Sequence, residues 1–238
     1  MDAATFVVAA VAAGRIRVSD QVPAPAEAAS WRAEVLAGYA HIRRTPALAA
    51  VLAAGAAVMA LSGLLVAAQY SLVPGVGEPP AFLGVFEACL GGGSVAASLM
   101  SSRILRRVGE GWLAVLGIAD FGVGTALRAT GVLGWALAGA VVLGFALPWV
   151  FLAVVNLAQR VTPGNLQGRV SAAVTLVMFG PQAPMQALGS VAILYGTYRQ
   201  LYAGGAIVAL ACAAYLAWRV ARMAAADKQQ ATHAAAAS

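Results

Sequence analysis

The sequence predicts an all-α integral membrane protein in which six transmembrane helices form a bundle. Its composition is the first observation: of 238 residues, 61% are hydrophobic and 10% are charged, against roughly 25% charged residues in ordinary soluble domains. The second is a mean hydropathy of +0.82. The third is the arrangement of the apolar residues in long runs separated by short turns, because a run of about 20 apolar residues crosses a bilayer as a helix.

Six apolar segments have the length of a membrane-spanning helix. The sequence places them at residues 47–73, 81–102, 112–129, 132–158, 170–194 and 201–218. The fourth contains Pro148, and the fifth contains Pro181 and Pro184. Because proline lacks the backbone donor of a helix interior, we expect these two helices to be broken in mid-membrane. Residues 47–222 are therefore the expected transmembrane domain.

Three further segments flank this domain. Residues 1–17 contain a short apolar run, Thr5 to Ala13, which is interpreted as the end of a spanning helix whose beginning is missing. Residues 18–46 are predicted to be a cytoplasmic connector with an amphipathic helix after Ser30, or alternatively an irregular solvated linker. Residues 223–238 are polar and Ala-rich, and we expect a disordered tail.

Basic residues predict the orientation of the chain. Arg103, Arg106 and Arg107 lie in the turn between the second and third spans. If successive loops lie on alternate sides of the membrane, thirteen of the 15 Lys and Arg lie on the same side as this turn, and only Arg128 and Arg199 lie on the other. Since positively charged loops stay in the cytoplasm, we expect a multi-pass protein of the plasma membrane. The connector, the turn at 103–110 and the C-terminus would be cytoplasmic.

Several function classes are excluded by the residues present. The basic residues are scattered at the ends of apolar runs, which argues against nucleic-acid binding. His41 and His233 stand far apart, and Cys89 and Cys212 lie within apolar segments, so no metal, cofactor or disulfide is predicted. No nucleophile, base and orienting group share a spacing that would indicate an enzyme.

Two acidic residues within the spans, Glu87 and Asp120, are candidates for proton coupling, because a charge at membrane depth is costly unless it is paired or hydrated. Contact with interfacial water is the alternative explanation of Glu87. A structural hydrogen bond to a neighbouring helix is the alternative for Asp120. The helix of Glu87 also carries a stripe of small residues that predicts a close helix contact, at Gly84, Ala88, Gly92 and Ala96.

Residues near the two proline sites are candidates for a substrate path. They combine aromatic and amide side chains, which suits an amphiphilic small molecule. The candidates are Trp149, Asn156, Phe179, Gln182 and Gln186. Packing against lipid or core is the alternative for the aromatic residues, and interfacial solvation is the alternative for Asn156.

Three motifs resemble a known family. Arg43-Arg44-Thr45-Pro46 precedes the first span, residues 103–110 read RILRRVGE, and Pro163 is followed by Gln167-Gly168-Arg169-Val170. Together they resemble the second half of a major facilitator superfamily transporter. The closest look-alikes are drug:proton antiporters of the macrolide-efflux and siderophore-export group. The turn lacks an initial Asp, and its glycines at 91–93 precede the arginines, which departs from the family's signature loop.

This resemblance implies a fold and a function. The six spans would be helices 7–12 of a twelve-helix exporter, and residues 1–17 would end helix 6. Helices 7, 8, 10 and 11 line the path in that family, whereas the helix of Asp120 is peripheral, which favours a structural role for it. The cytoplasmic gating loop would comprise Arg103, Arg106, Arg107, Gly109, Gln167, Gly168 and Arg169. The alternative is that the arginines of the turn only fix the topology.

The leading hypothesis is thus a fragment of a proton-coupled exporter of small amphiphilic molecules. Its partners would be the lipid bilayer, the proton, the substrate and an N-terminal half on the same chain. Two alternatives remain open. One is a split transporter, in which the second half is a separate chain or another copy. The other is a non-transporting six-helix scaffold or binding protein, in which Glu87 has no role in transport.

Overall fold

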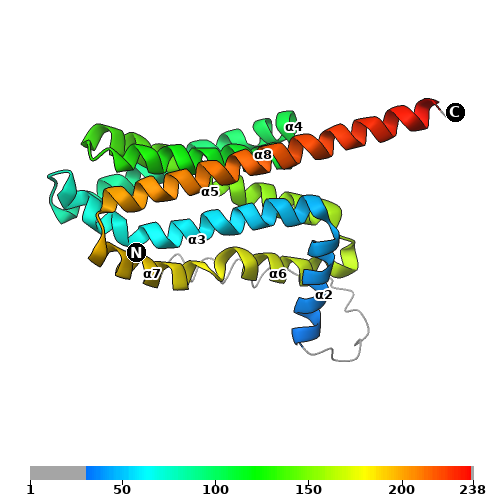
Figure 1. The fold of residues 1–238 in the computed structure, drawn as a ribbon, viewed down its shortest axis with the longest axis horizontal. Coiled ribbons are helices and arrows are strands. Elements are labelled where there is room, and N and C mark those ends of the chain that lie inside the picture. The colour runs from blue at the N-terminus through cyan, green and yellow to red at the C-terminus, as the bar shows by residue number, and fades with distance from the viewer. Residues whose placement is uncertain (1–30, 237–238) are drawn as a thin grey trace, which may run out of the picture. The chain divides into compact units, whose positions relative to one another are not determined.

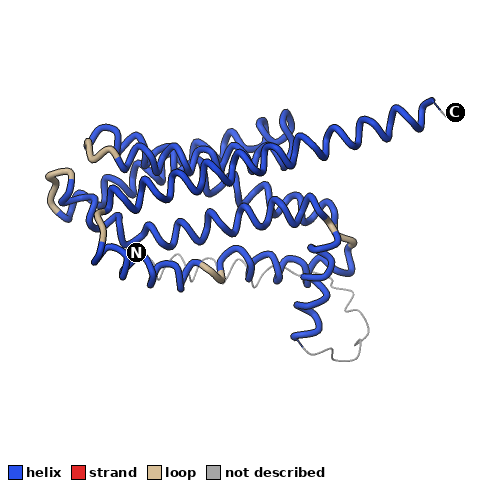
Figure 2. The backbone as a smooth tube through the Cα atoms, in the orientation of Figure 1, coloured by secondary structure: helices blue, strands red, loops and turns tan. Residues whose placement is uncertain are grey.

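The computed structural model describes residues 31–236, and Figure 1 shows its helices. They are α2 (Trp31–Arg44), α3 (Pro46–Gly75), α4 (Leu83–Ala129), α5 (Leu133–Val161), α6 (Gln167–Phe179), α7 (Gln182–Tyr195) and α8 (Tyr198–Ala236), with short 3₁₀ turns at Pro80–Phe82 and Gly164–Leu166. Figure 2 shows helices and loops but no strand in this part of the chain. The segment 1–17 and the first part of the connector lie outside the described residues.

Within residues 31–236, four helical runs could cross a membrane by their length and composition. The helical runs that are long and apolar enough to cross a bilayer are Pro46–Gly75, Pro80–Ala129, Leu133–Val161 and Tyr198–Ala226. The chain is therefore an all-α protein with the helices of an embedded one. Four such runs lie over six predicted spans for two reasons. The run Pro80–Ala129 contains two helical arms and covers two predicted spans. The fifth predicted span is divided between α6 and α7, which have 13 and 14 residues, too few to cross the hydrocarbon core singly.

The helix α4 consists of two arms that meet at Gly109. This glycine has φ 78° and ψ 171°, a conformation open almost only to glycine. The first arm, 83–108, meets α5 near Val141 through Gly93 and near Trp149 through Ala97. The second arm, 110–129, meets α5 in the reverse order, with Gly117 at Val150 and Gly124 at Gly139. The two arms therefore run in opposite directions along α5.

A proline inside α5 does not break that helix, which corrects the expectation for the fourth span. The helix is continuous from Leu133 to Val161 through Pro148. Pro148 cannot donate to the carbonyl oxygen of Gly144, four residues earlier. The hydroxyl of Ser94, from the first arm of α4, lies 3.0 Å from that oxygen. The same hydroxyl lies 3.1 Å from the Leu90 carbonyl oxygen of its own helix, so its single proton is shared between the two acceptors. The neighbouring helix thus supplies part of the missing donation.

The fifth predicted span is interrupted at Pro181, as expected, whereas Pro184 lies within the first turn of α7. The helix α6 ends at Phe179, and α7 begins at Gln182, after Gly180 and Pro181. Both halves lie beside α3. The backbone of Gln182 comes so close to Gly63 that a Cβ on this glycine would overlap the Gln182 carbonyl.

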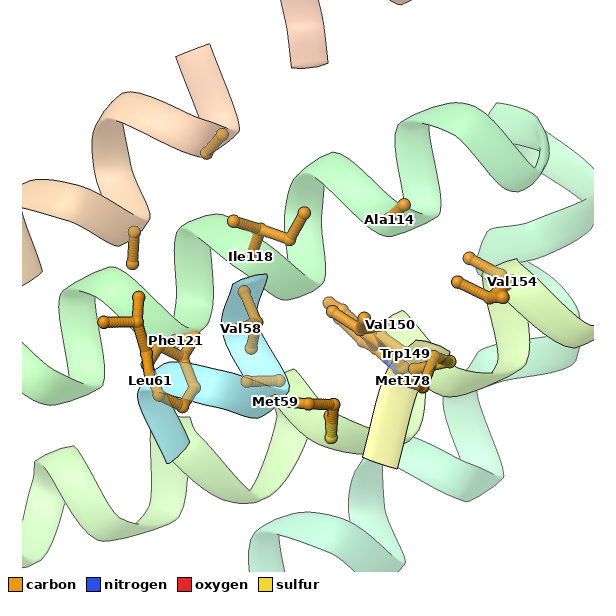
Figure 3. Close-up of a cluster of buried hydrophobic side chains, with 14 of the residues drawn as sticks. Val58, Met59, Leu61, Ala114, Ile118, Phe121, Trp149, Val150, Val154 and Met178 are labelled. Atoms are coloured by element: carbon orange, nitrogen blue, oxygen red, sulfur yellow. The ribbon is translucent and has the colours of Figure 1, made fainter. Parts of the chain in front are cut away.

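The hydrophobic core lies where α3, the second arm of α4, α5 and α6 meet (Figure 3). The side chains labelled there come from all four segments: Val58, Met59 and Leu61 from α3, Ala114, Ile118 and Phe121 from the second arm, Trp149, Val150 and Val154 from α5, and Met178 from α6. Glycine allows α3 and α5 to approach closely in this core. A Cβ on Gly55 would lie 3.2 Å from a methyl of Val154.

The helix α2 lies in the predicted connector and contacts α6. Gly38 of α2 faces the backbone of Arg169, so that a Cβ there would lie 2.5 Å from the Arg169 carbonyl oxygen. Ile42 is buried, whereas Leu36 and Tyr39 are exposed. The exposed apolar side chains are those expected of a helix that lies on a membrane surface.

The helix α8 continues to Ala236, into residues 223–238, where the sequence predicted a disordered tail. The segment after Arg222 is rich in alanine, which has the highest helix propensity of all residues. This local preference accounts for the helical state.

Candidate functional site

The candidate site is a polar cluster of four side chains from α3, both arms of α4, and α8. The Nε2 of Gln69 donates to the Glu87 carboxylate at 2.5 Å. The Oε1 of Gln69 lies 3.4 Å from the Nη1 of Arg128, and the Tyr202 hydroxyl oxygen lies 3.4 Å from the same nitrogen. Gln69 thus connects an exposed carboxylate with a buried guanidinium.

Arg128 is buried although it is the second-last residue of α4. Its side chain is 2% exposed. The guanidinium carbon lies 5.6 Å from the ring centre of Phe86 and 5.9 Å from that of Tyr202, so both rings make cation–π contacts. Gly139 of α5 leaves room beside the arginine stem, since a Cβ there would lie 3.2 Å from the Arg128 Cγ.

The hydrogen bonding of this arginine is incomplete. The Nε and Nη2 of Arg128 are buried and have no hydrogen-bond partner among the described residues. Among the side chains that the structure describes, no carboxylate lies within 4.0 Å of its guanidinium, whereas Arg160 pairs with Glu110 at 3.0 Å. A buried charge without a partner is costly, because the surrounding helices cannot solvate it.

A cavity of about 70 Å³ lies beside the cluster. It is lined by Ser62, Leu65, Val66, Gln69, Leu90, Phe121, Thr125, Arg128, Leu143, Leu147 and Tyr202. One water needs roughly 10–15 Å³ by this measure, so the cavity holds a few waters or a small ion. Sites for drug-sized molecules are about 300–1,000 Å³. This cavity is therefore too small for an amphiphilic substrate.

Glu87 is exposed, one turn after the start of α4. The small residues near it do not make the predicted helix contact, because a Cβ on Gly84, Gly91 or Gly92 would meet no atom within 4 Å. The close contact is made instead by Gly93, whose Cβ would overlap the Val141 carbonyl oxygen. The face of the first arm that carries Glu87 is therefore uncovered within the described residues.

Asp120, the other candidate acid, lies apart from this cluster. It is half-buried on the second arm of α4 and does not line the cavity. Its carboxylate has no hydrogen bond or ion pair within residues 31–236, so the described part of the chain does not contain the interhelical bond considered for it.

The predicted substrate-path residues are distributed over α5, α6 and α7. Trp149 is buried, donates from its Nε1 to the Ala97 carbonyl at 3.2 Å, and packs edge-on against Phe145. Its role in the structure is thus to join α5 to the first arm of α4. Asn156 donates to the Leu152 carbonyl of its own helix at 2.9 Å.

The remaining path candidates lie at the surface. Phe179 is 42% exposed and lies 6.1 Å, centre to centre, from Phe151 of α5. Gln182 is half-buried against α3, and Gln186 is exposed. A cavity of about 130 Å³ lies between α5 and α6 and includes Phe151 in its lining. None of the five candidates lines the cavity beside Arg128.

A larger groove of about 390 Å³ lies between α3 and α8. Its lining is mostly alanine, with Cys212, Tyr215 and Arg219 from α8. None of the predicted path residues belongs to it. This substrate-sized groove therefore lies away from the predicted substrate-path residues.

The residues of the predicted gating loop lie in two turns. Arg103, Arg106 and Arg107 are exposed at the end of the first arm, and Gly109 forms the reversal. Gln167 and Gly168 are exposed at the start of α6. The Glu110–Arg160 ion pair connects the first turn to the end of α5, shortly before the second turn begins. A role in gating remains a prediction.

Sequence reasoning missed three members of the cluster. Gln69, Arg128 and Tyr202 come from separate spans, and Arg128 was counted only as one of two basic residues on the outer side. The one signal in the sequence was an arginine within the last turn of an apolar run, on the side that otherwise had almost no basic residues.

Comparison with protein-family models, with curated proteins and with solved structures gives no match for this chain.

Proposed function

We propose that this chain forms one half of a secondary transporter that exchanges protons for small amphiphilic molecules. The observation that carries the proposal is the position of Glu87. This carboxylate stands on an uncovered face of an apolar helix and is linked through Gln69 to the buried Arg128. A carboxylate facing lipid is unfavourable, so such a face fits better against a water-filled path or a second protein half.

Six crossings are part of the proposal. The opposite directions of the two arms of α4 support separate crossings, with the basic turn between them. The helices α6 and α7 together have the length of one further crossing, interrupted at Gly180 and Pro181. With α3, α5 and α8 the total is six. The distribution of basic residues supports a plasma-membrane protein with the 103–110 turn in the cytoplasm.

The half-transporter proposal is supported by two poorly covered helices. The first arm of α4 buries only Phe86, Gly93, Ala97 and Ser101, and α7 buries only Gly189. Their exposed residues include polar ones, among them Ser98 and Gln186. By the resemblance, these helices correspond to path-lining ones. A second six-helix half, on the same chain or on another, would cover them.

Cysteine labelling in native membranes tests whether this face meets water. In a background with Cys89 and Cys212 replaced by alanine, we expect Ser98→Cys to react with a water-soluble maleimide. Val123→Cys is the matched control, because Val123 is exposed on the second arm and is expected to face lipid. Equal, negligible labelling of both positions would contradict a water-filled path and favour a scaffold.

Transport is tested with two copies of the chain joined in tandem by a polar linker. If each copy crosses the membrane six times, both of its ends lie on the same side, so the linker does not have to cross the membrane. In proteoliposomes with an imposed pH gradient, we expect accumulation of the lipophilic cation ethidium. Glu87→Gln should abolish the pH-driven component, whereas Asp120→Asn should retain it. Flux that is identical in the Glu87→Gln variant would contradict proton coupling at this residue.

A further inference from the structure

We propose that Arg128 binds a small monovalent anion, such as chloride or formate, in the cavity between α3, α4, α5 and α8. Anion binding at this site does not depend on the proposed transport function. The guanidinium is buried, carries two nitrogens without a partner, and has no carboxylate within 4.0 Å among the described side chains. An anion in the adjoining cavity would balance this charge.

Hydrogen-bond donors lining the cavity fit an anion. The Tyr202 oxygen accepts from Arg128 Nη1, so its own proton is available to donate. The hydroxyl of Ser62 has no hydrogen bond within residues 31–236 and lines the same cavity. With the guanidinium, these groups supply a positive charge and two hydroxyl donors. Thr125 is different, because its hydroxyl already donates to the Phe121 carbonyl at 2.6 Å.

The size of the cavity limits the ligand. A volume of about 70 Å³ accommodates a halide or formate with one or two waters, because one water needs roughly 10–15 Å³. Gluconate, a monovalent anion with six carbon atoms, exceeds this space. The comparison of chloride with gluconate therefore separates binding in the cavity from a general effect of salt.

Glu87 is the nearest acid in the hydrogen-bonded chain and reaches Arg128 only through Gln69. Asp120 lies eight residues before Arg128 on the same arm, about 12 Å along the axis. The exposed Arg199 lies close by and donates to the Thr130 carbonyl at 2.8 Å. Since Glu87 and the anion compensate the same charge, removal of the carboxylate should tighten anion binding.

The test measures thermal unfolding of the purified full chain in detergent, followed by tryptophan fluorescence. Sodium gluconate is replaced stepwise by sodium chloride or formate at constant ionic strength. We expect both ions to raise the unfolding midpoint by about 5 °C at a concentration of about 30 times the dissociation constant, since a ligand that binds only the folded state stabilises it. Equal midpoints in chloride and gluconate would overturn the proposal.

Variants locate the effect. Arg128→Gln should lose the chloride response, and Arg199→Gln, the matched control, should keep it. If Arg128→Gln does not fold, Tyr202→Phe and Ser62→Ala remain decisive, because each removes one donor and should raise the apparent chloride dissociation constant. Glu87→Gln should lower that constant by about threefold or more. An unchanged constant in Tyr202→Phe and Ser62→Ala would refute the site.

Anionic lipid is the other source of a negative group. Phosphatidylglycerol added to the detergent micelles in gluconate buffer should not reproduce the chloride shift, because a lipid phosphate carries substituents that the cavity cannot hold. Stabilisation by this lipid without any response to chloride would overturn the proposal and indicate a headgroup contact instead.

Discussion

The hydroxyl of Ser94 lies 3.0 Å from the carbonyl oxygen of Gly144, the acceptor that Pro148 leaves without a donor in its own helix. The bond joins the first arm of α4 to α5. Gly144 also lies against the backbone of Leu90 and Gly93. Close packing and the hydroxyl together allow a proline in the middle of a continuous helix.

Ser94→Ala should lower the free energy of unfolding by about 1–2 kcal/mol, because a buried carbonyl loses its partner. Ser98→Ala is the control, since Ser98 bonds to the Ser94 carbonyl within its own helix. Pro148→Ala restores a backbone N–H, so the Ser94→Ala change should cost less in that background. Additive effects in the double variant, measured by urea or detergent titration, would argue against the assignment.

Gly109→Ala should destabilise the reversal of α4 by about 1–3 kcal/mol, because φ 78° with ψ 171° is strained for a residue with a Cβ. Gly168→Ala serves as the control. It has no positive φ, and its Cβ would meet no atom within 4 Å. The midpoints of thermal unfolding of the two variants provide the comparison, and an equal loss in both would show that strain at Gly109 is not the cause.

Gly93→Ala should destabilise the chain by about 1–3 kcal/mol, because the added methyl overlaps the Val141 carbonyl oxygen. Gly91→Ala and Gly92→Ala add the same methyl in open space, and the isolated chain should tolerate both. Unfolding in detergent distinguishes the three neighbours. If transport requires a second half on this face, Gly91→Ala and Gly92→Ala should reduce transport without reducing stability.

Gly38→Ala should weaken the contact of α2 with α6, because its Cβ would lie 2.5 Å from the Arg169 carbonyl oxygen. Arg43 and Arg44 are exposed at the end of α2, so faster trypsin cleavage there reports loss of the contact. Ala40→Ser, at an exposed position of the same helix, should be cleaved at the original rate. Unchanged cleavage in Gly38→Ala would show that α2 does not depend on this contact.

The apolar runs and the turns between them were predictable because each depends on a short stretch of sequence. Helices lie over all six predicted spans, and the break at Gly180 and Pro181 lies where the proline pair placed it. The number of crossings stays a prediction. The effect of Pro148 was not predictable, since it depends on a hydroxyl 54 positions away in the chain.

The candidate site was predictable only in part. An acid inside an apolar run is a visible signal, and Glu87 does belong to the polar cluster. Its partners were hidden, because the number of residues between Gln69, Arg128 and Tyr202 carries no information about which helices become neighbours. The sequence placed Arg128 at the outer end of the third span, whereas the structure buries it against α3, α5 and α8.

The sequence by itself determined the helical class, the apolar segments and the basic turn at Arg103, Arg106 and Arg107, because these follow from hydropathy, length and local charge. Only the tertiary structure decided that Gly93 packs while Gly91 and Gly92 stay open, and that Arg128 is buried beside a cavity. Helical spacing fixes which residues share a face. Whether another helix covers that face depends on the packing of the whole bundle.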